Sequence, residues 1–159
     1  MKKFELTSEF VTFLGKKLFR IKALISFRNV EEGELGGYVE KEENLSNDGN
    51  AWVSGDAMVS GNARVCGNAR VYGNAEVYGN ARVYGDADYA TVHGFGSEYR
   101  TTTFFRTKAG EIGVRCGCFY GTLEEFRAKI KETHGETKTA KEYLMVADLM
   151  EFRFSKEEA

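Results

Sequence analysis

The middle of the chain repeats one pattern of small apolar and polar positions. Each repeat reads Gly, then Asn or Asp, then Ala, a variable residue, Val and a second variable residue. Ala and Val two positions apart lie on one face of a strand, and Gly-Asn or Gly-Asp is turn chemistry. Short strands joined by like corners are therefore predicted. The repeat glycines are Gly49, Gly55, Gly61, Gly67, Gly73, Gly79 and Gly85.

Six residues cannot bury their own Ala and Val, so successive repeats must stack on one another. Three strands with three corners then complete one turn of a coil. A flat meander of hairpins is the alternative, but strands this short would leave Ala and Val without a shared interior. We therefore expect a stacked coil whose two open ends are covered by other parts of the chain.

Apolar positions on both sides of the repeat predict such elements. Upstream, strands are expected near 3–6, 10–14 and 17–27, with a turn at Gly15-Lys16. Downstream, residues 90–94 keep the residue pattern of the repeat but come three residues earlier than its period of six requires. Beyond them, alternating apolar and polar residues predict strands over 99–106 and 112–118. A capping box at 122–125 opens a helix that ends at His134-Gly135, and a second helix runs from near Thr137 or Thr139 to about Phe154.

The repeats, together with residues 18–24, 33–39 and 44–46, resemble the hexapeptide-repeat proteins that form left-handed parallel β-helices. The spelling is most similar to the YdcK-like branch of bacteria and phages, over roughly residues 12–93. The spelling over 113–126 and 133–135 resembles segments appended to repeat proteins of phages. Left-handedness is implied by the resemblance alone, because crossovers between parallel strands are usually right-handed.

The predicted fold is mainly β: a short left-handed parallel β-helix with an N-terminal β cap and a C-terminal α+β segment of ββαα order. Counting Val39 and Leu45 as degenerate Ala-type positions gives about three coils. The expected domains are the cap over 1–38, the β-helix over 39–93 and the ββαα domain over 94–159.

The amino-acid composition limits the binding partners and the cellular compartment that can be expected. The chain has 159 residues, 18 of them Gly and none Pro, and a net charge of −2, so it has no overall attraction to nucleic acid or an anionic membrane. Three cysteines are too few for a disulfide framework, which favours a reducing cytoplasm. The start imitates a signal peptide, but Glu5 and Glu9 interrupt any apolar core and no stretch is long enough to span a bilayer.

The sequence contains few candidates for catalytic residues. The resemblance implies acyl transfer from acyl-coenzyme A first, and His93 is the one candidate base, because His134 sits where a helix C-terminus favours a cation. No coil carries the long loop that usually shapes an acceptor pocket. Two histidines cannot form the three-histidine zinc site of the carbonic-anhydrase relatives. Cys116 and Cys118 are expected to be small buried side chains, so we expect neither metal nor cofactor.

Two groups of basic and aromatic residues are candidates for binding. On the coil, stacking places Arg64 over Arg82 and Cys66 over Tyr84. The two arginines are either splayed apart and solvated, or part of an interface with a partner. The resemblance to hexapeptide-repeat β-helices also implies assembly into trimers, so a homo-oligomer, with a trimer favoured, is expected. The second group suits a nucleotide phosphate or an acidic protein surface, with ordinary surface ion pairs as the alternative. It comprises His93, Tyr99, Arg100, Arg106, Lys108 and Arg115.

We therefore expect a cytoplasmic, non-catalytic binding protein. Its resemblance to phage-borne accessory proteins implies that it inhibits or sequesters a host component: a defence protein such as a CRISPR nuclease, or a signalling nucleotide. The alternatives are an acyl-coenzyme A-dependent acyltransferase and a structural or assembly scaffold. Membrane and direct nucleic-acid binding are not expected. The predicted binding residues are Arg64, Arg82, Tyr84, His93, Tyr99, Arg100, Arg106 and Arg115.

Overall fold

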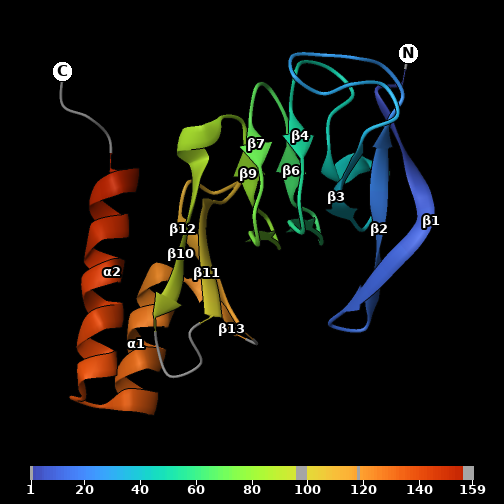
Figure 1. Cartoon of the computed structure of the whole chain (residues 1–159). Coiled ribbons are helices and arrows are strands. Elements are labelled where there is room, and N and C mark those ends of the chain that lie inside the picture. Colours follow the sequence, from blue (N-terminus) through green and yellow to red (C-terminus); the bar gives the residue numbers. More distant parts are fainter. Residues whose placement is uncertain (1, 96–99, 118, 156–159) are drawn as a thin grey trace. The chain divides into compact units, whose positions relative to one another are not determined.

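A computed structural model describes residues 2–95, 100–117 and 119–155 (Figure 1). The chain divides into two compact units, Met1–Asp86 and Ala87–Ala159. The regular elements that the structure describes in the first unit are mainly strands with a short 3-10 helix, and the second unit contains a sheet and two α-helices. The fold is thus mainly β with a C-terminal two-helix segment, as the sequence predicted.

The first unit begins with three antiparallel strands. β1 (Phe4–Phe13) and β2 (Lys16–Ala23) form a hairpin, and β3 (Leu35–Val39) pairs with β2. The sequence predicted separate strands near 3–6 and 10–14, but β1 runs through both and shifts its register between Leu6 and Phe10. The Thr7 hydroxyl fills that irregularity by donating to the backbone oxygen of Arg20 at 2.8 Å.

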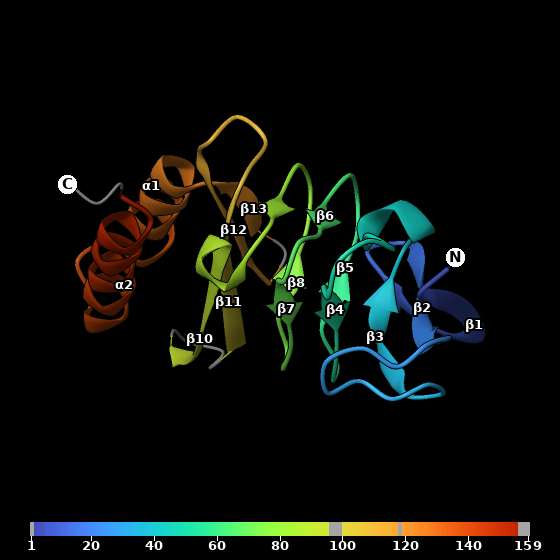
Figure 2. The ribbon, with the colours of Figure 1, turned by 90° about the horizontal axis from the view of Figure 1, so that it is seen from above.

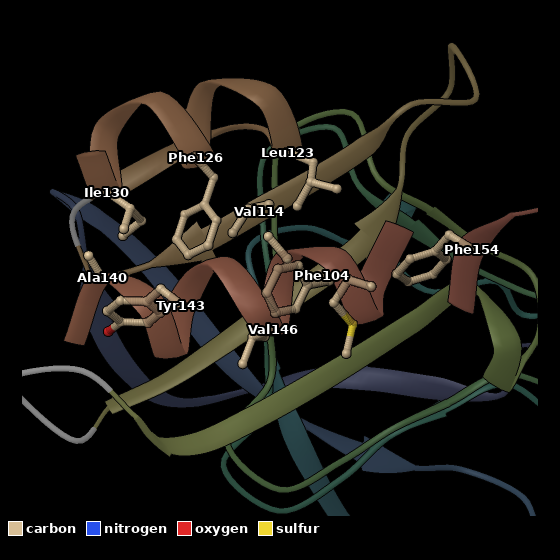
Figure 3. Packing of buried hydrophobic residues seen from close by; sticks show 11 residues of the cluster. Phe104, Val114, Leu123, Phe126, Ile130, Ala140, Tyr143, Val146 and Phe154 are labelled. Atoms are coloured by element: carbon tan, nitrogen blue, oxygen red, sulfur yellow. The ribbon is translucent and has the colours of Figure 1, made fainter. Parts of the chain in front are cut away.

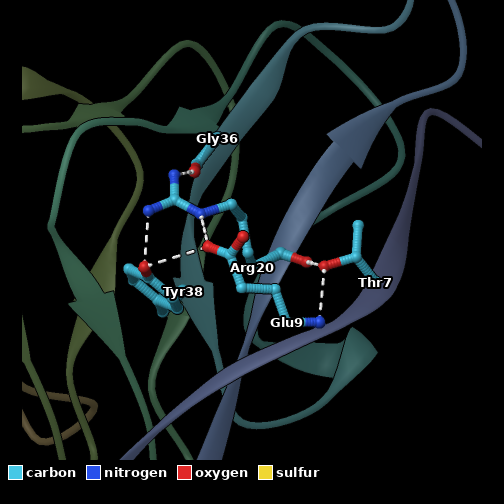
Figure 4. A network of polar contacts seen from close by, with 5 residues as sticks. All are labelled: Thr7, Glu9, Arg20, Gly36 and Tyr38. Atoms are coloured by element: carbon cyan, nitrogen blue, oxygen red, sulfur yellow. Dashed lines mark hydrogen bonds and ion pairs between the residues drawn. The ribbon is translucent and has the colours of Figure 1, made fainter.

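Arg20 joins these three strands at one point (Figure 4). Its Nε pairs with the carboxylate of Glu9 on β1, and its Nη1 donates to the Gly36 carbonyl on β3 at 2.8 Å. Its guanidinium carbon lies 4.5 Å from the centre of the Tyr38 ring. Side-chain bonds to both neighbours of β2 therefore reinforce the backbone ladder of the hairpin.

The repeat forms two-residue strands that pair in parallel. β4 (Trp52–Val53) pairs with β7 (Arg70–Val71), β5 (Met58–Val59) with β8 (Glu76–Val77), and β6 (Arg64–Val65) with β9 (Arg82–Val83). The stacking of Arg64 against Arg82 is confirmed. Trp52 lies opposite Arg70 in the same way. Figure 2 shows the strands following one another along the unit. The segment is a β-solenoid of parallel sheets.

Small side chains and backbone bonds hold the turns of the solenoid together. The Ala and Val of each repeat from Ala51 to Val83 are at most 1 % exposed. Backbone amides donate across to the next turn, as from Ser54 to the Val71 carbonyl at 2.8 Å. The next repeat is different: after Gly85, the short η2 (Asp86–Asp88) follows and Ala87 is exposed.

The first turn departs from the expected register. Val39 lies opposite Val59, and Leu45 forms a parallel bridge with Val65. Both therefore occupy Val-type positions, and their interpretation as Ala-type positions was wrong. The reason is a longer corner between Leu45 and Ala51, where the Asn47 side chain accepts a bond from the Lys3 amide at 2.9 Å.

Gly36 lets β3 lie very close to the first turn. A Cβ at this position would stand 2.5 Å from the Val53 carbonyl oxygen and 2.7 Å from an atom of the Trp52 ring. The backbone at Gly36 is not left-handed, so glycine is needed there for space.

The second unit is a four-stranded antiparallel sheet with two helices. The strands are β10 (Tyr89–Phe95), β11 (Arg100–Arg106), β12 (Ile112–Cys116) and β13 (Phe119–Thr122), in that order across the sheet. β10 and β13 were not predicted from the sequence. Residues 90–94 spell a degenerate repeat, yet they pair along β11, so this unit begins ahead of residue 94. The tail is ββββαα in order.

Both helices agree with the sequence prediction. α1 (Leu123–His134) starts at a complete Thr122–Glu125 capping box, and α2 (Lys138–Phe154) starts at Thr137, whose hydroxyl accepts from the Ala140 amide at 3.2 Å. The helices cover the sheet face that carries Phe104 and Val114 (Figure 3). In the described part of the chain, neither is long and apolar enough to cross a membrane.

Candidate binding surface

Arg64 and Arg82 stand side by side on the sheet formed by β6 and β9, and their side chains behave differently. Arg82 turns to the backbone, where its Nη1 donates to the Asn62 carbonyl at 2.7 Å and to the Ala81 carbonyl at 3.0 Å. Arg64 is exposed, and its guanidinium makes no hydrogen bond or ion pair with any residue that the structure describes. Backbone carbonyls thus offset the charge of one arginine and leave the other available.

Arg64 lines an open pocket of about 450 Å³ in the first unit. Leu45 and Val65 belong to the lining, but their side chains are buried inside the solenoid at 1 % and 0 % exposed, whereas the Tyr84 ring on one wall is 56 % exposed. Cavities that combine an aromatic side chain with a few polar groups are a common form of binding site. The full lining is Glu42, Glu43, Leu45, Ser46, Asn47, Arg64, Val65, Cys66 and Tyr84.

A buried asparagine fixes the wall opposite Tyr84. This wall is η1 (Glu42–Asn44). Asn44 is fully buried, and its side-chain amide donates to the carbonyls of Gly61 at 3.2 Å and Ala63 at 2.9 Å. Its side-chain oxygen accepts from the Lys41 amide at 2.9 Å. Because these bonds tie η1 to the strand beneath, the pocket wall is preformed.

The pocket carries charges of both signs. Glu42 is neutralised by Lys2, whose Nζ lies 3.0 Å from the Glu42 carboxylate. Glu43 is exposed, as is Arg64. The pocket therefore offers one guanidinium and one carboxylate beside an aromatic ring, an arrangement suited to a ligand that is itself both charged and apolar.

The second predicted group does not form one cluster. Arg106 pairs with Asp88 at 2.9 Å and donates to the Phe154 carbonyl at 3.1 Å. Its guanidinium carbon lies 5.2 Å from the Phe154 ring centre, on the helix-covered face of the sheet. Arg115 pairs in register with Thr103, so its side chain lies on the opposite face from Phe104 and Arg106, and it is 2 % exposed. Arg106 therefore forms an ion pair that stabilises the C-terminal unit.

The remaining predicted residues of this group are dispersed. His93 is exposed, with its Nδ1 2.7 Å from the Thr101 hydroxyl. Arg100 lies over Gly117 at the other end of β11 from Arg106, and Lys108 is exposed in the turn after β11. Tyr99 lies outside the described residues, and so does Cys118. Cys116 is half-buried and packs against the core, where its Sγ accepts a bond from the Thr102 hydroxyl at 3.1 Å.

The acidic wall of the pocket was not predicted from the sequence. Glu42 and Glu43 belong to no repeat, and their place depends on Asn44, whose bonds reach residues far along the chain. The sequence feature that could have indicated this wall is the run Glu42-Glu43-Asn44, which interrupts the repeat and is followed by a longer corner. A break in a regular repeat marks a place where backbone groups must find other partners.

A buried lysine lies near this corner. Lys3 is 1 % exposed, and its Nζ donates to the Ala51 carbonyl at 2.5 Å and lies 4.9 Å from the Phe27 ring centre. Burial lowers its pKa to about 8, while the charge of Asp48 acts in the opposite direction. We assign Lys3 to the fold, because it joins the N-terminal strand to the first turn of the solenoid.

These features define a β-solenoid protein with a separate α+β unit and a mixed-charge pocket on the solenoid. The repeat is similar to the YdcK beta solenoid repeat family, which it matches over residues 51–66, 63–77 and 75–87. That match supports a β-solenoid of the hexapeptide type. A search of curated proteins found no match.

Proposed function

We propose that the chain is a non-catalytic binding protein that holds a segment of another protein in the pocket of its solenoid. The observation that carries the proposal is the Arg64 guanidinium, which lines a cavity of about 450 Å³ beside the exposed Tyr84 ring. Arg and Tyr are the residues that most often anchor protein contacts. A carboxylate on the partner would pair with Arg64, and an apolar side chain would cover the exposed Tyr84 ring.

The charges of the lining favour a protein segment over a nucleotide. A nucleotide would place its phosphate on Arg64 and its base on Tyr84. Lys2 neutralises Glu42, but the exposed Glu43 on the facing wall would repel a ligand that carries two or more negative charges. A peptide segment bears both signs of charge and can pair with Arg64 and Glu43 together.

The position of His93 supports binding over acyl transfer. An acyltransferase of the hexapeptide class would need its base on the solenoid. His93 lies on β10 of the second unit, where its ring contacts the Thr101 hydroxyl. The binding proposal uses no group from that strand.

Finer features of the proposal rest on the resemblance. We propose that the three parallel sheets close as one left-handed β-helix, which would keep each Ala and Val in a common interior. We also propose that the bound partner is a host component that the chain inhibits or sequesters, as a phage-borne accessory protein would do. A host defence protein fits the mixed-charge pocket better than a signalling nucleotide does.

Affinity capture from a bacterial lysate tests the proposal. The immobilised full chain is compared with Arg64→Glu, Tyr84→Ala and the matched control Arg70→Glu, which changes the same repeat position on a neighbouring sheet. We expect a protein that the wild type and control retain and that Arg64→Glu retains at least about tenfold less. Equal retention by all four chains contradicts the proposal. Depletion of a mononucleotide in equilibrium dialysis would assign the pocket to a nucleotide instead.

A further inference from the structure

Helix α2 carries a row of large apolar side chains that its own unit does not bury. Met145 is 71 % exposed, Leu149 is 56 % exposed and Phe152 is 78 % exposed. They are spaced four and three positions apart, so they form one stripe along the helix. Single exposed apolar residues are ordinary, but an aligned row of three marks an interaction surface.

The core of the unit uses the other side of the same helix. Ala140, Tyr143, Ala147, Met150 and Phe154 are each at most 5 % exposed and pack against α1 and the sheet. At 3.6 residues per turn this buried stripe lies on the opposite side of α2 from Leu149 and its neighbours. A helix that is apolar on two opposite sides requires two partners. The intramolecular core supplies only one of them.

We propose that a second copy of this chain covers the outward stripe, with the two α2 helices antiparallel about a two-fold axis. In that arrangement Met145 of one copy faces Leu149 of the second copy, and the same contact recurs by symmetry. Phe152 then lies over the side-chain stems of the first turn of the facing helix, which carries Lys138 and Lys141.

The charges beside the stripe complement one another in this arrangement. Glu142 and Arg153 lie on the same flank, and the pairing that joins Met145 to Leu149 also brings Glu142 opposite Arg153 of the second copy. Neither residue has an ion-pair partner within 2–95, 100–117 or 119–155. The two-fold axis would therefore form two equivalent ion pairs around an apolar centre.

The other flank permits the same approach. There Asp148 would come near Asp148 of the second copy, but its charge is already compensated, because Arg127 of α1 donates to it at 3.0 Å. Arg127 also pairs with Glu124 and Glu151. Each flank carries a carboxylate together with a guanidinium, Glu142 with Arg153 and Asp148 with Arg127. Interfacial helices instead border their apolar face with an excess of Lys and Arg, so a lipid surface is a poor occupant.

Light scattering and sedimentation of the full chain test the proposal. We expect a mass twice the 17.8 kDa of one chain at about 100 μM, a concentration that favours weak dimers. Leu149→Glu with Phe152→Glu is expected to give a monomer, whereas the control Leu35→Glu, at a side chain 52 % exposed in the first unit, keeps the dimer. A wild-type monomer overturns the proposal, as does a larger assembly that the α2 variants leave intact.

A charge exchange tests the antiparallel geometry. Glu142→Arg alone and Arg153→Glu alone each place like charges opposite one another, so each is expected to weaken the dimer about tenfold. The double variant restores opposite charges and is expected to recover most of that loss. If the double variant is as weak as the sum of the single ones, the pairing of these helices is not the one proposed. Circular dichroism of every variant confirms that α2 remains folded.

Discussion

The two units of the chain reach a buried core by opposite means. In the solenoid, small Ala and Val side chains lie under strands of two residues, and each turn bonds mainly to the next. In the C-terminal unit, a few large rings form the core: Phe126 lies 6.0 Å from Phe104, 5.7 Å from Phe119 and 5.7 Å from Tyr143, measured between ring centres. The first core is spread along the chain, whereas the second is concentrated.

This difference determines where a single change acts. In a solenoid each turn contacts only its neighbours, so a substitution acts locally unless it separates two turns. In a concentrated core, removing one ring deprives several elements of their shared contact. Two probes separate the units: the single tryptophan, Trp52, lies in the solenoid, and both α-helices, which dominate far-ultraviolet circular dichroism, lie in the other unit.

Phe126→Ala should have the largest effect, confined to the C-terminal unit. Removing this 2 % exposed ring is expected to lower the free energy of unfolding of that unit by about 4 kcal/mol. The denaturant midpoint followed by circular dichroism should fall, while the midpoint of Trp52 fluorescence stays. The exposed Lys129→Ala on the same helix should move neither midpoint. If both midpoints move together in Phe126→Ala, the two units unfold as one.

The buried Lys3 should make the solenoid more stable at alkaline pH. Its pKa is about 8 in the folded chain against 10.5 as its ordinary value, so between these two pH values the unfolded chain binds more protons. Stability therefore rises as the pH increases from 8 to 10.5, by about 3 kcal/mol in total. Trp52 fluorescence should report the rise. Lys3→Met should remove it, and an unchanged slope in that variant would assign the effect elsewhere.

Gly36→Ala tests the close approach of β3 to the first solenoid turn. The new Cβ would meet a backbone oxygen at 2.5 Å, so the strands must separate. We expect a loss of about 2 kcal/mol in unfolding followed by Trp52. Gly85→Ala is the matched control, because a Cβ there has open space and the backbone is not left-handed. If Gly36→Ala loses no more stability than Gly85→Ala, the close approach of β3 does not require glycine at position 36.

Regular local patterns allowed much of this fold to be predicted. Each Gly-Asn or Gly-Asp corner repeats, so the register that places Arg64 beside Arg82 follows from counting. The Thr122–Glu125 box likewise fixed the start of α1. β10 was missed because residues 90–94 imitate the repeat, and the sheet partner that decides their structure, β11, follows them in the chain.

The candidate pocket depended on long-range bonds that a local pattern does not contain. The acidic wall is held by Asn44, which bonds to carbonyls of the next turn, and the register of Leu45 depends on the length of the following corner. Arg82 was paired with Arg64 as an equal candidate, but carbonyls of its own unit engage it. The sequence thus placed both arginines on one face, and the structure shows that the Arg82 guanidinium is engaged by carbonyls while Arg64 is exposed.

The smallest effect on stability is expected from a change at Thr122, where the sheet of the C-terminal unit joins α1. The Thr122 hydroxyl accepts from the Glu125 amide at 3.2 Å, and the Glu125 carboxylate accepts from the Thr122 amide at 3.0 Å. Thr122→Ala removes the first bond, so the C-terminal unit should lose about 1 kcal/mol while the Trp52 transition stays unchanged. Thr122→Ser keeps the hydroxyl and should retain nearly all of the stability. If Thr122→Ser loses as much as Thr122→Ala, packing of the Thr122 methyl, and not the helix cap, would be the stabilising contact.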